Sequence, residues 1–136
     1  MNYRSVLDSA FAVATSLGYH PSLPDSLHRT LCEVGFPIAM ITPPMVISSG
    51  SGKGVPTTCR LGVKFLSKNV LSDQGRAVSI SSLATHAEQF CKLLSSEPHI
   101  FSVSILEIAP VGEVLSVAGE VAVSLSADIE SMECDY

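Results

Sequence analysis

The residues that could carry chemistry are few, and their spacing departs from the common catalytic and binding motifs. A glycine-rich stretch around Lys53 is the first candidate, because glycine-rich loops bind phosphate through backbone N–H groups. A phosphate-binding loop needs a glycine five residues before its Gly-Lys pair and a Ser or Thr after the lysine. Ile47 and Gly54 occupy these positions, and a strand is expected where the motif requires a helix. We therefore expect a hairpin tip at Lys53 and no nucleotide site.

The histidines, cysteines, carboxylates and serines give no stronger signal for a reactive site. His86 and Cys91 do not lie on one helical face in the register of metal ligands, and no Cys-x-x-Cys pair is present. The segment Ser49–Gly52 begins with Ser where a Gly-x-Ser-x-Gly nucleophile elbow has Gly, and no helix is expected after it. The acidic residues form no paired-carboxylate motif. The sequence thus indicates no catalytic residue, no metal ligand and no cofactor, and it does not predict an enzyme.

The composition indicates a single domain, residues 1–136, with few charges. Charged residues make up 15% of the chain, against roughly 25% in a typical soluble domain. Because surface charge keeps a monomer dispersed, this deficit favours a surface that is partly covered in an assembly. Cys32, Cys59 and Cys91 fall in segments with an apolar pattern, and we expect their thiols to be buried and free of disulfides.

Charge and hydropathy exclude two classes of partner. The net charge is −5, no Lys/Arg block offsets it and Trp is absent, so a face that recognises nucleic acid is not expected. No apolar run approaches the ~18 residues of a membrane span. The first residues also lack the basic start and apolar core of a signal peptide. We therefore expect a cytoplasmic protein that does not insert into a membrane.

Two segments have apolar side chains at the three- and four-residue spacing of amphipathic helices. The first covers residues 3–17 and ends at Gly18, which suits a left-handed C-terminal cap. The second ends near Leu94, and its start is open between two alternatives. A cap at Ser72–Asp73 would give a long helix, and a cap at Ser81–Ser82 a shorter one.

Three strands are expected before the last one. The first runs from Phe36 to Ile41 and resumes after Pro43–Pro44. Because prolines have no N–H to donate, this strand is either an edge of the sheet or bends at the prolines. Residues 59–65 alternate and complete a β-hairpin with a long tip. Residues 101–108 change phase near Glu107, which predicts a bulge.

The last strand, Leu115–Leu125, has the strictest alternation in the chain. Its inward side is apolar or glycine, which fixes its register, because a slip of one residue would turn this set to the other face. Its outward side is small and hydroxylic with one charge, so it is either solvated or in contact with another chain. The inward residues are Leu115, Val117, Gly119, Val121, Val123 and Leu125, and the outward residues are Ser116, Ala118, Glu120, Ala122 and Ser124.

These elements predict an α+β fold with the order α-β-β-α-β-β. Residues 19–35 contain Pro21 and Pro24 and are expected to form a connector with one or two helical turns. The four strands form two hairpins, of which the first is long. They give an antiparallel four-stranded sheet with the two main helices packed on one face.

This order of elements, with several local features, resembles the tail terminator and tail completion proteins of long-tailed bacteriophages and prophages. The features are Phe36-Pro37-Ile38-Ala39 entering a strand, the long-tipped hairpin up to Arg60-Leu61-Gly62-Val63, and residues 115–121 in the closing pair. The resemblance implies a non-enzymatic structural protein that assembles in the cytoplasm and ends in the virion tail. It also implies a homo-oligomeric ring, commonly a hexamer, in contact with tail-tube or head–tail connector proteins.

In that family the sheet and the extended hairpin carry the subunit and tube contacts. The resemblance therefore implies an interface on the first strand, the hairpin tip and the outward face of the last strand. The implied interface residues are Ile38, Met40, Thr42, Ser48, Gly50, Gly52, Lys53, Ser116, Ala118, Glu120, Ala122 and Ser124.

Two alternatives from other classes stay open. One is a small α+β enzyme or ligand-binding domain with a pocket between sheet and helices. The other is an adaptor that binds a peptide along the strand from Phe36 to Ile41. The mass in solution separates them, because a ring supports assembly whereas a monomer with a deep polar pocket supports the enzyme.

Overall fold

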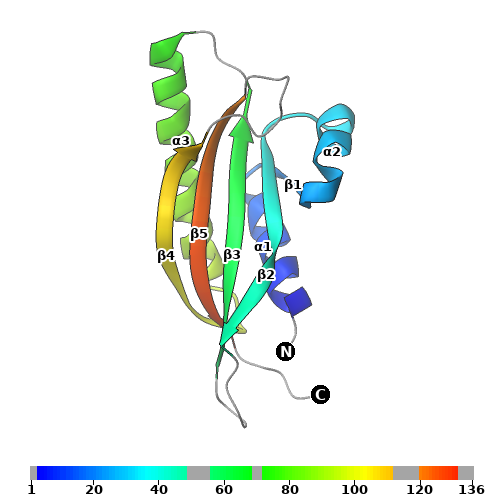
Figure 1. The fold of residues 1–136 in the computed structure, drawn as a ribbon, viewed down its shortest axis with the longest axis vertical. Helices are drawn as coiled ribbons and strands as arrows, with labels where there is room; N and C mark the ends of the chain where they lie inside the picture. Colours follow the sequence, from blue (N-terminus) through cyan, green and yellow to red (C-terminus); the bar gives the residue numbers. More distant parts are fainter. Residues whose placement is uncertain (1–2, 49–55, 69–71, 112–119, 132–136) are drawn as a thin grey trace.

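The structure is a computed structural model that describes residues 3–48, 56–68, 72–111 and 120–131 (Figure 1). In chain order these residues form α1 (Tyr3–Ser16), β1 (His20–Ser22), the 3₁₀ turn η1 (Pro24–Ser26), α2 (Leu27–Glu33), β2 (Ile38–Ser48), β3 (Thr57–Ser67), α3 (Asp73–Leu94), β4 (Ile100–Val111) and β5 (Val121–Ser131). None of the helices in these ranges is both long and apolar enough to span a membrane.

The strands form one five-stranded sheet in the order β1-β2-β3-β5-β4. β1 pairs in parallel with Ile38–Met40 of β2, whereas the other neighbouring strands are antiparallel. The predicted α+β class is confirmed, but the prediction of a four-stranded antiparallel sheet is wrong. The additional strand has three residues, one of them Pro21, and is too short to show an alternation in the sequence. The backbone N–H of His20 donates to the carbonyl of Pro37 at 2.9 Å and holds this strand beside β2.

α1 and α3 cover one face of the sheet, as predicted for the two main helices (Figure 1). The inward side chains of α1 pack on β2, those of α3 pack on β5, β4 and β3, and together they form the main core. At its centre the fully buried ring of Phe65 makes edge-to-face contacts with Tyr19 and Phe90, at centroid distances of 5.2 and 5.6 Å. The inward residues of the last strand that the structure describes are buried as the alternation predicts: Val121, Val123 and Leu125.

α2 packs on the opposite face, at one end of the sheet. Its residue Leu27 is buried in a second apolar cluster with Ile38, Met40, Leu66 and Ala122. These strand residues alternate with those of the main core, so their side chains point away from α1 and α3. The sequence predicted helical turns in this connector, but the docking of α2 onto the sheet was not foreseen.

Two predicted irregularities in the strands are confirmed. The register of β2 against β3 shifts between Thr42 and Met45, which is where Pro43 and Pro44 interrupt the ladder. The register of β4 against β5 shifts between Ile105 and Glu107, as the change of phase in the sequence indicated.

The start of α3 settles the choice between a long and a short second helix. α3 begins at Asp73, and Ser72 is its N-cap residue with the extended backbone (φ −97°, ψ 146°) typical of that position. The Oγ atom of Ser72 accepts a hydrogen bond from the N–H of Gly75 at 3.0 Å. The long alternative is therefore correct.

Replacing Ser72 by alanine should lower the free energy of unfolding by about 1 kcal/mol, because the N–H of Gly75 loses its acceptor. Ser81→Ala is the matched control, since Ser81 lies in the helix interior and alanine is the better helix former there. Urea denaturation measures both variants. An equal or smaller loss for Ser72→Ala than for Ser81→Ala would contradict the capping role.

Candidate functional site

The face of the sheet opposite α1 and α3 is the first candidate site. Among the residues that the structure describes, α2 covers only the end of this face where Ile38, Leu66 and Ala122 lie. The strand pairing aligns the rest in rows that cross β2, β3, β5 and β4 in turn. The two central rows are Thr42, Gly62, Ser126, Glu107 and then Met45, Arg60, Asp128, Ser104.

Small hydroxylic residues dominate the uncovered face on β5 and β4. Ser124 and Ser126 continue the outward pattern of the last strand, and Ser102 and Ser104 lie on the same face of β4. On this face the guanidinium of Arg60 donates to the Asp128 carboxylate at 2.9 and 3.3 Å. Lys64, Glu107 and Glu130 lie on the same face, so the face is polar and its positive and negative charges nearly balance.

Large apolar side chains are exposed along the two strands that border this face. β2 and β4 hold five of the eight such side chains in the described residues. Met45 is the most exposed of them, at 67%. Phe101 and Leu106 fall at the two positions where the register of β4 shifts, so the bulges accompany their exposure. The five residues are Met45, Ile47, Phe101, Ile105 and Leu106, of which Ile105 pairs with Ala127 of the main core and so lies on the helix-covered side.

The predicted interface residues divide into three groups. Thr42 is exposed and Ser124 half-buried on the uncovered face, as expected, and Ser48 is the last residue of β2. Glu120 and Ala122 are buried, so their predicted exposure is wrong. Ile38 and Met40 are also buried, and α2 covers them together with Ala122. The remaining residues lie outside the described ranges: Gly50, Gly52, Lys53, Ser116 and Ala118.

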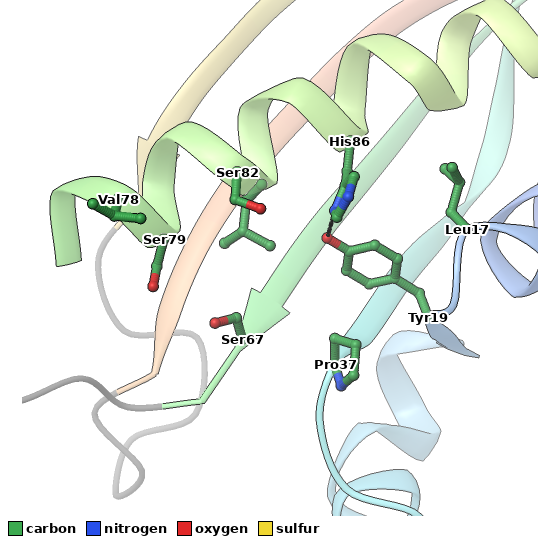
Figure 2. A pocket seen from close by; sticks show the side chains of 9 residues that line it. Leu17, Tyr19, Pro37, Ser67, Val78, Ser79, Ser82 and His86 are labelled. Atoms are coloured by element: carbon green, nitrogen blue, oxygen red, sulfur yellow. Dashed lines mark hydrogen bonds between the residues drawn. The ribbon is translucent and has the colours of Figure 1, made fainter. Parts of the chain in front are cut away.

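A cleft on the helix-covered side of the sheet is the second candidate site. It has a volume of about 340 Å³ and lies between the first half of α3, the end of β3 and the segment that follows α1 (Figure 2). Its polar side chains are the hydroxyls of Ser67, Ser79 and Ser82, with Tyr19 and His86 at one end. Its apolar side chains are Leu17, Pro37, Val78 and Leu83.

Tyr19 and His86 form a hydrogen-bonded pair in this cleft. The Tyr19 hydroxyl lies 2.6 Å from Nδ1 of His86, and the two rings meet edge to face at a centroid distance of 5.4 Å (Figure 2). Burial raises the pKa of Tyr19 to about 12, so the phenol keeps its proton at neutral pH. The Tyr19 hydroxyl donates to Nδ1 in the tautomer with the imidazole proton on Nε2, and it accepts from Nδ1–H in the other tautomer.

The contacts of His86 differ from a serine-hydrolase arrangement. A histidine that activates a serine is hydrogen-bonded to the serine hydroxyl, whereas His86 is hydrogen-bonded to Tyr19. The structure shows no hydrogen bond between Ser82 and His86 within the ranges it describes. The pair can therefore orient a ligand, but its geometry does not generate a nucleophile.

The cysteines and histidines of the described ranges assemble no reactive centre. Burial raises the pKa of Cys59 and of Cys91 to about 11, so both thiols stay protonated, and the charge of Asp128 adds to this at Cys59. Cys32 is exposed on α2, which corrects the prediction that it is buried. No group of three His, Cys, Asp or Glu residues in the described part of the chain could hold a metal ion.

The comparison with protein-family models gives no match, and no curated protein matches the chain either. The edge that the peptide-binding alternative requires is partly occupied, because β1 pairs with Ile38–Met40 of β2.

Proposed function

We propose that this chain is a non-enzymatic structural protein that self-associates through the uncovered face of its sheet. The observation that carries the proposal is an uncovered polar face of nearly balanced charge, bordered on β2 and β4 by exposed large apolar side chains. An antiparallel sheet can leave one face in water. The apolar side chains form two borders that β3 and β5 separate, and exposed apolar groups beside polar residues often mark protein interfaces.

The size of the face suits an interface. Four strands and about eight residues along each give roughly 20 Å by 25 Å, or about 500 Å² in projection. A standard interface buries about 800 Å² on each partner. The pleat of the sheet and the exposed apolar borders bring the area of this face into that range.

The centre of the face can receive a protruding side chain from a neighbouring subunit. Gly62 and Ser126 are paired at the centre and carry little side-chain volume. Phe101 and Leu106 protrude from β4, at the border of the same face. If two subunits exchange this contact reciprocally, it is isologous and gives a two-fold dimer, whereas a one-way contact is heterologous and generates a closed ring when the rotation closes; we propose the one-way contact.

We propose that the ring has the same structural role as the rings of the tail terminator and tail completion proteins that the sequence resembles. We propose a homo-oligomer of that type, with a hexamer as the commonest form in the family. Its further partners would be tail-tube or head–tail connector proteins, after assembly in the cytoplasm. Capsid, portal and tail-tube genes beside its own gene would support this role.

The mass in solution tests the interface directly. We expect a ring for the unmodified chain and a monomer for Ser126→Arg, because a long charged side chain at the centre of the face blocks close approach. Gln89→Arg adds the same charge on the exposed side of α3 and should leave the ring intact. Native mass spectrometry and light scattering measure the masses, and circular dichroism confirms that each variant is folded.

Two results would contradict the proposal. One is an unmodified chain that stays monomeric at every concentration. The other is a Ser126→Arg variant with the mass of the unmodified ring, which would exclude the uncovered face as the contact surface.

A further inference from the structure

We propose that the cleft beside Tyr19 and His86 binds a small, uncharged, hydroxyl-rich ligand of the size of a monosaccharide. The inference is independent of self-association, because the cleft lies on the helix-covered side of the sheet (Figure 2). It rests on the charge, the hydrogen-bonding groups and the volume of the cleft.

The described residues that line the cleft include no Lys, Arg, Asp or Glu. Among these residues a phosphate or carboxylate ligand would find no lysine or arginine to pair with, and an ammonium ligand would find no carboxylate. The lining therefore favours a neutral ligand.

Unused hydrogen-bonding groups face the cleft. The hydroxyls of Thr85 and Ser95 on the same helix donate to backbone carbonyls of the preceding turn. By contrast, the hydroxyls of Ser67, Ser79 and Ser82 have no hydrogen bond to any residue that the structure describes. Figure 2 shows Ser67 and Ser79 directed toward the space between α3 and the end of β3. A hydroxyl group both donates and accepts, so a ligand with several hydroxyls matches these serines best.

The Tyr19–His86 pair supplies an oriented donor. Tyr19 is only 4% exposed, and its ring is fixed by edge-to-face packing on Phe65. We assign the donor role in this hydrogen bond to the Tyr19 hydroxyl, 2.6 Å from Nδ1, so that Nε2–H of His86 donates to a ligand oxygen. Tyr19 is thus a positioning residue, which acts on the ligand through His86.

The apolar part and the volume of the cleft narrow the ligand class further. Leu17, Val78 and Leu83 offer an apolar surface to the C–H groups of a sugar ring. The volume of about 340 Å³ is at the small end of the roughly 300–1,000 Å³ of ligand sites. One or two sugar rings fit this volume.

Nuclear magnetic resonance titration of the full chain with methyl α-D-glucopyranoside and related neutral methyl glycosides tests the proposal. We expect saturable shifts at Ser67, Ser79, Ser82 and the His86 ring for at least one glycoside. Glucuronate and cyclohexanol are the charged and apolar comparisons. Saturable binding of either in place of the glycosides, or no shift with any probe, would overturn the proposal.

Matched variants test the assigned groups. Ser79→Ala should weaken binding about fivefold, the loss of one hydrogen bond, whereas Ser81→Ala, outside the cleft, should bind normally. Tyr19→Phe keeps the ring but removes the hydroxyl, so it should weaken binding and shift the His86 ¹⁵N signals away from the Nε2–H tautomer. Equal affinities for Ser79→Ala and Ser81→Ala, or an unchanged tautomer in Tyr19→Phe, would contradict these assignments.

Discussion

Replacing Phe65 by alanine should lower the free energy of unfolding by about 3–5 kcal/mol. Phe65 is 0% exposed at the centre of β3, and its ring contacts both Tyr19 and Phe90 edge to face. Truncation removes both ring contacts and leaves a cavity that the surrounding strands and α3 can fill only in part. Urea denaturation measures the loss, and the melting temperature should fall by roughly 10–20 °C.

Phe101→Ala is the matched control, because the same atoms are removed from a side chain that is 58% exposed. Its free energy of unfolding as a monomer should change by less than about 0.5 kcal/mol. A third variant, Phe65→Leu, should lose less than Phe65→Ala because it refills much of the cavity. A loss below about 1 kcal/mol for Phe65→Ala would show that this aromatic cluster is not the centre of the core.

The elements with long, regular patterns could be predicted from the sequence. α1 was expected at residues 3–17 and spans Tyr3–Ser16. The strict alternation of β5 placed Val121 and Val123 inward, where both are buried. These predictions succeed because each pattern extends over several turns or residue pairs and faces a single core.

The short elements between α1 and β2 could not be predicted in the same way. β1 has three residues, and α2 has seven. Neither is long enough to show its own period, and both depend on contacts with β2, such as the bond from His20 to Pro37. The sequence predicted one or two helical turns in this connector but not the packing of α2 on the sheet, so it placed Ala122 on the correct face but left it uncovered.

The two candidate sites also differ in how far they could be predicted from the sequence. The hydroxylic outer face was visible in the sequence because Ser124 lies on an alternating strand. The cleft was not visible, because it joins Tyr19 to His86 across 67 residues. The one signal at His86 in the sequence was its spacing from Cys91 along the chain. Because Cys91 is buried, that spacing did not point to the cleft.

Ala122→Arg should destabilise the subunit strongly. This variant tests whether Ala122 is buried, as in the structure, or exposed, as the sequence pattern predicted. An exposed Ala122 at an interface would tolerate arginine in the monomer and lose only assembly. Ala122 is instead 1% exposed, in a cluster with Leu27, Met40 and Leu66. Arginine there overfills the cluster and buries an unpaired charge, so we expect a loss of several kcal/mol or the release of α2 from the sheet.

Ser124→Arg is the matched control for this prediction. Ser124 is the next residue on the same face of β5, half-buried and beyond the apolar cluster that includes α2. Its free energy of unfolding as a monomer should stay near that of the monomeric unmodified chain. Urea denaturation measures both variants, and hydrogen exchange of the amides in Leu27–Glu33 reports whether α2 stays docked. Full protection of α2 and an unchanged free energy of unfolding in Ala122→Arg would show that arginine is tolerated at this position. That result would contradict the burial of Ala122 and support the prediction from the sequence that Ala122 is exposed at an interface.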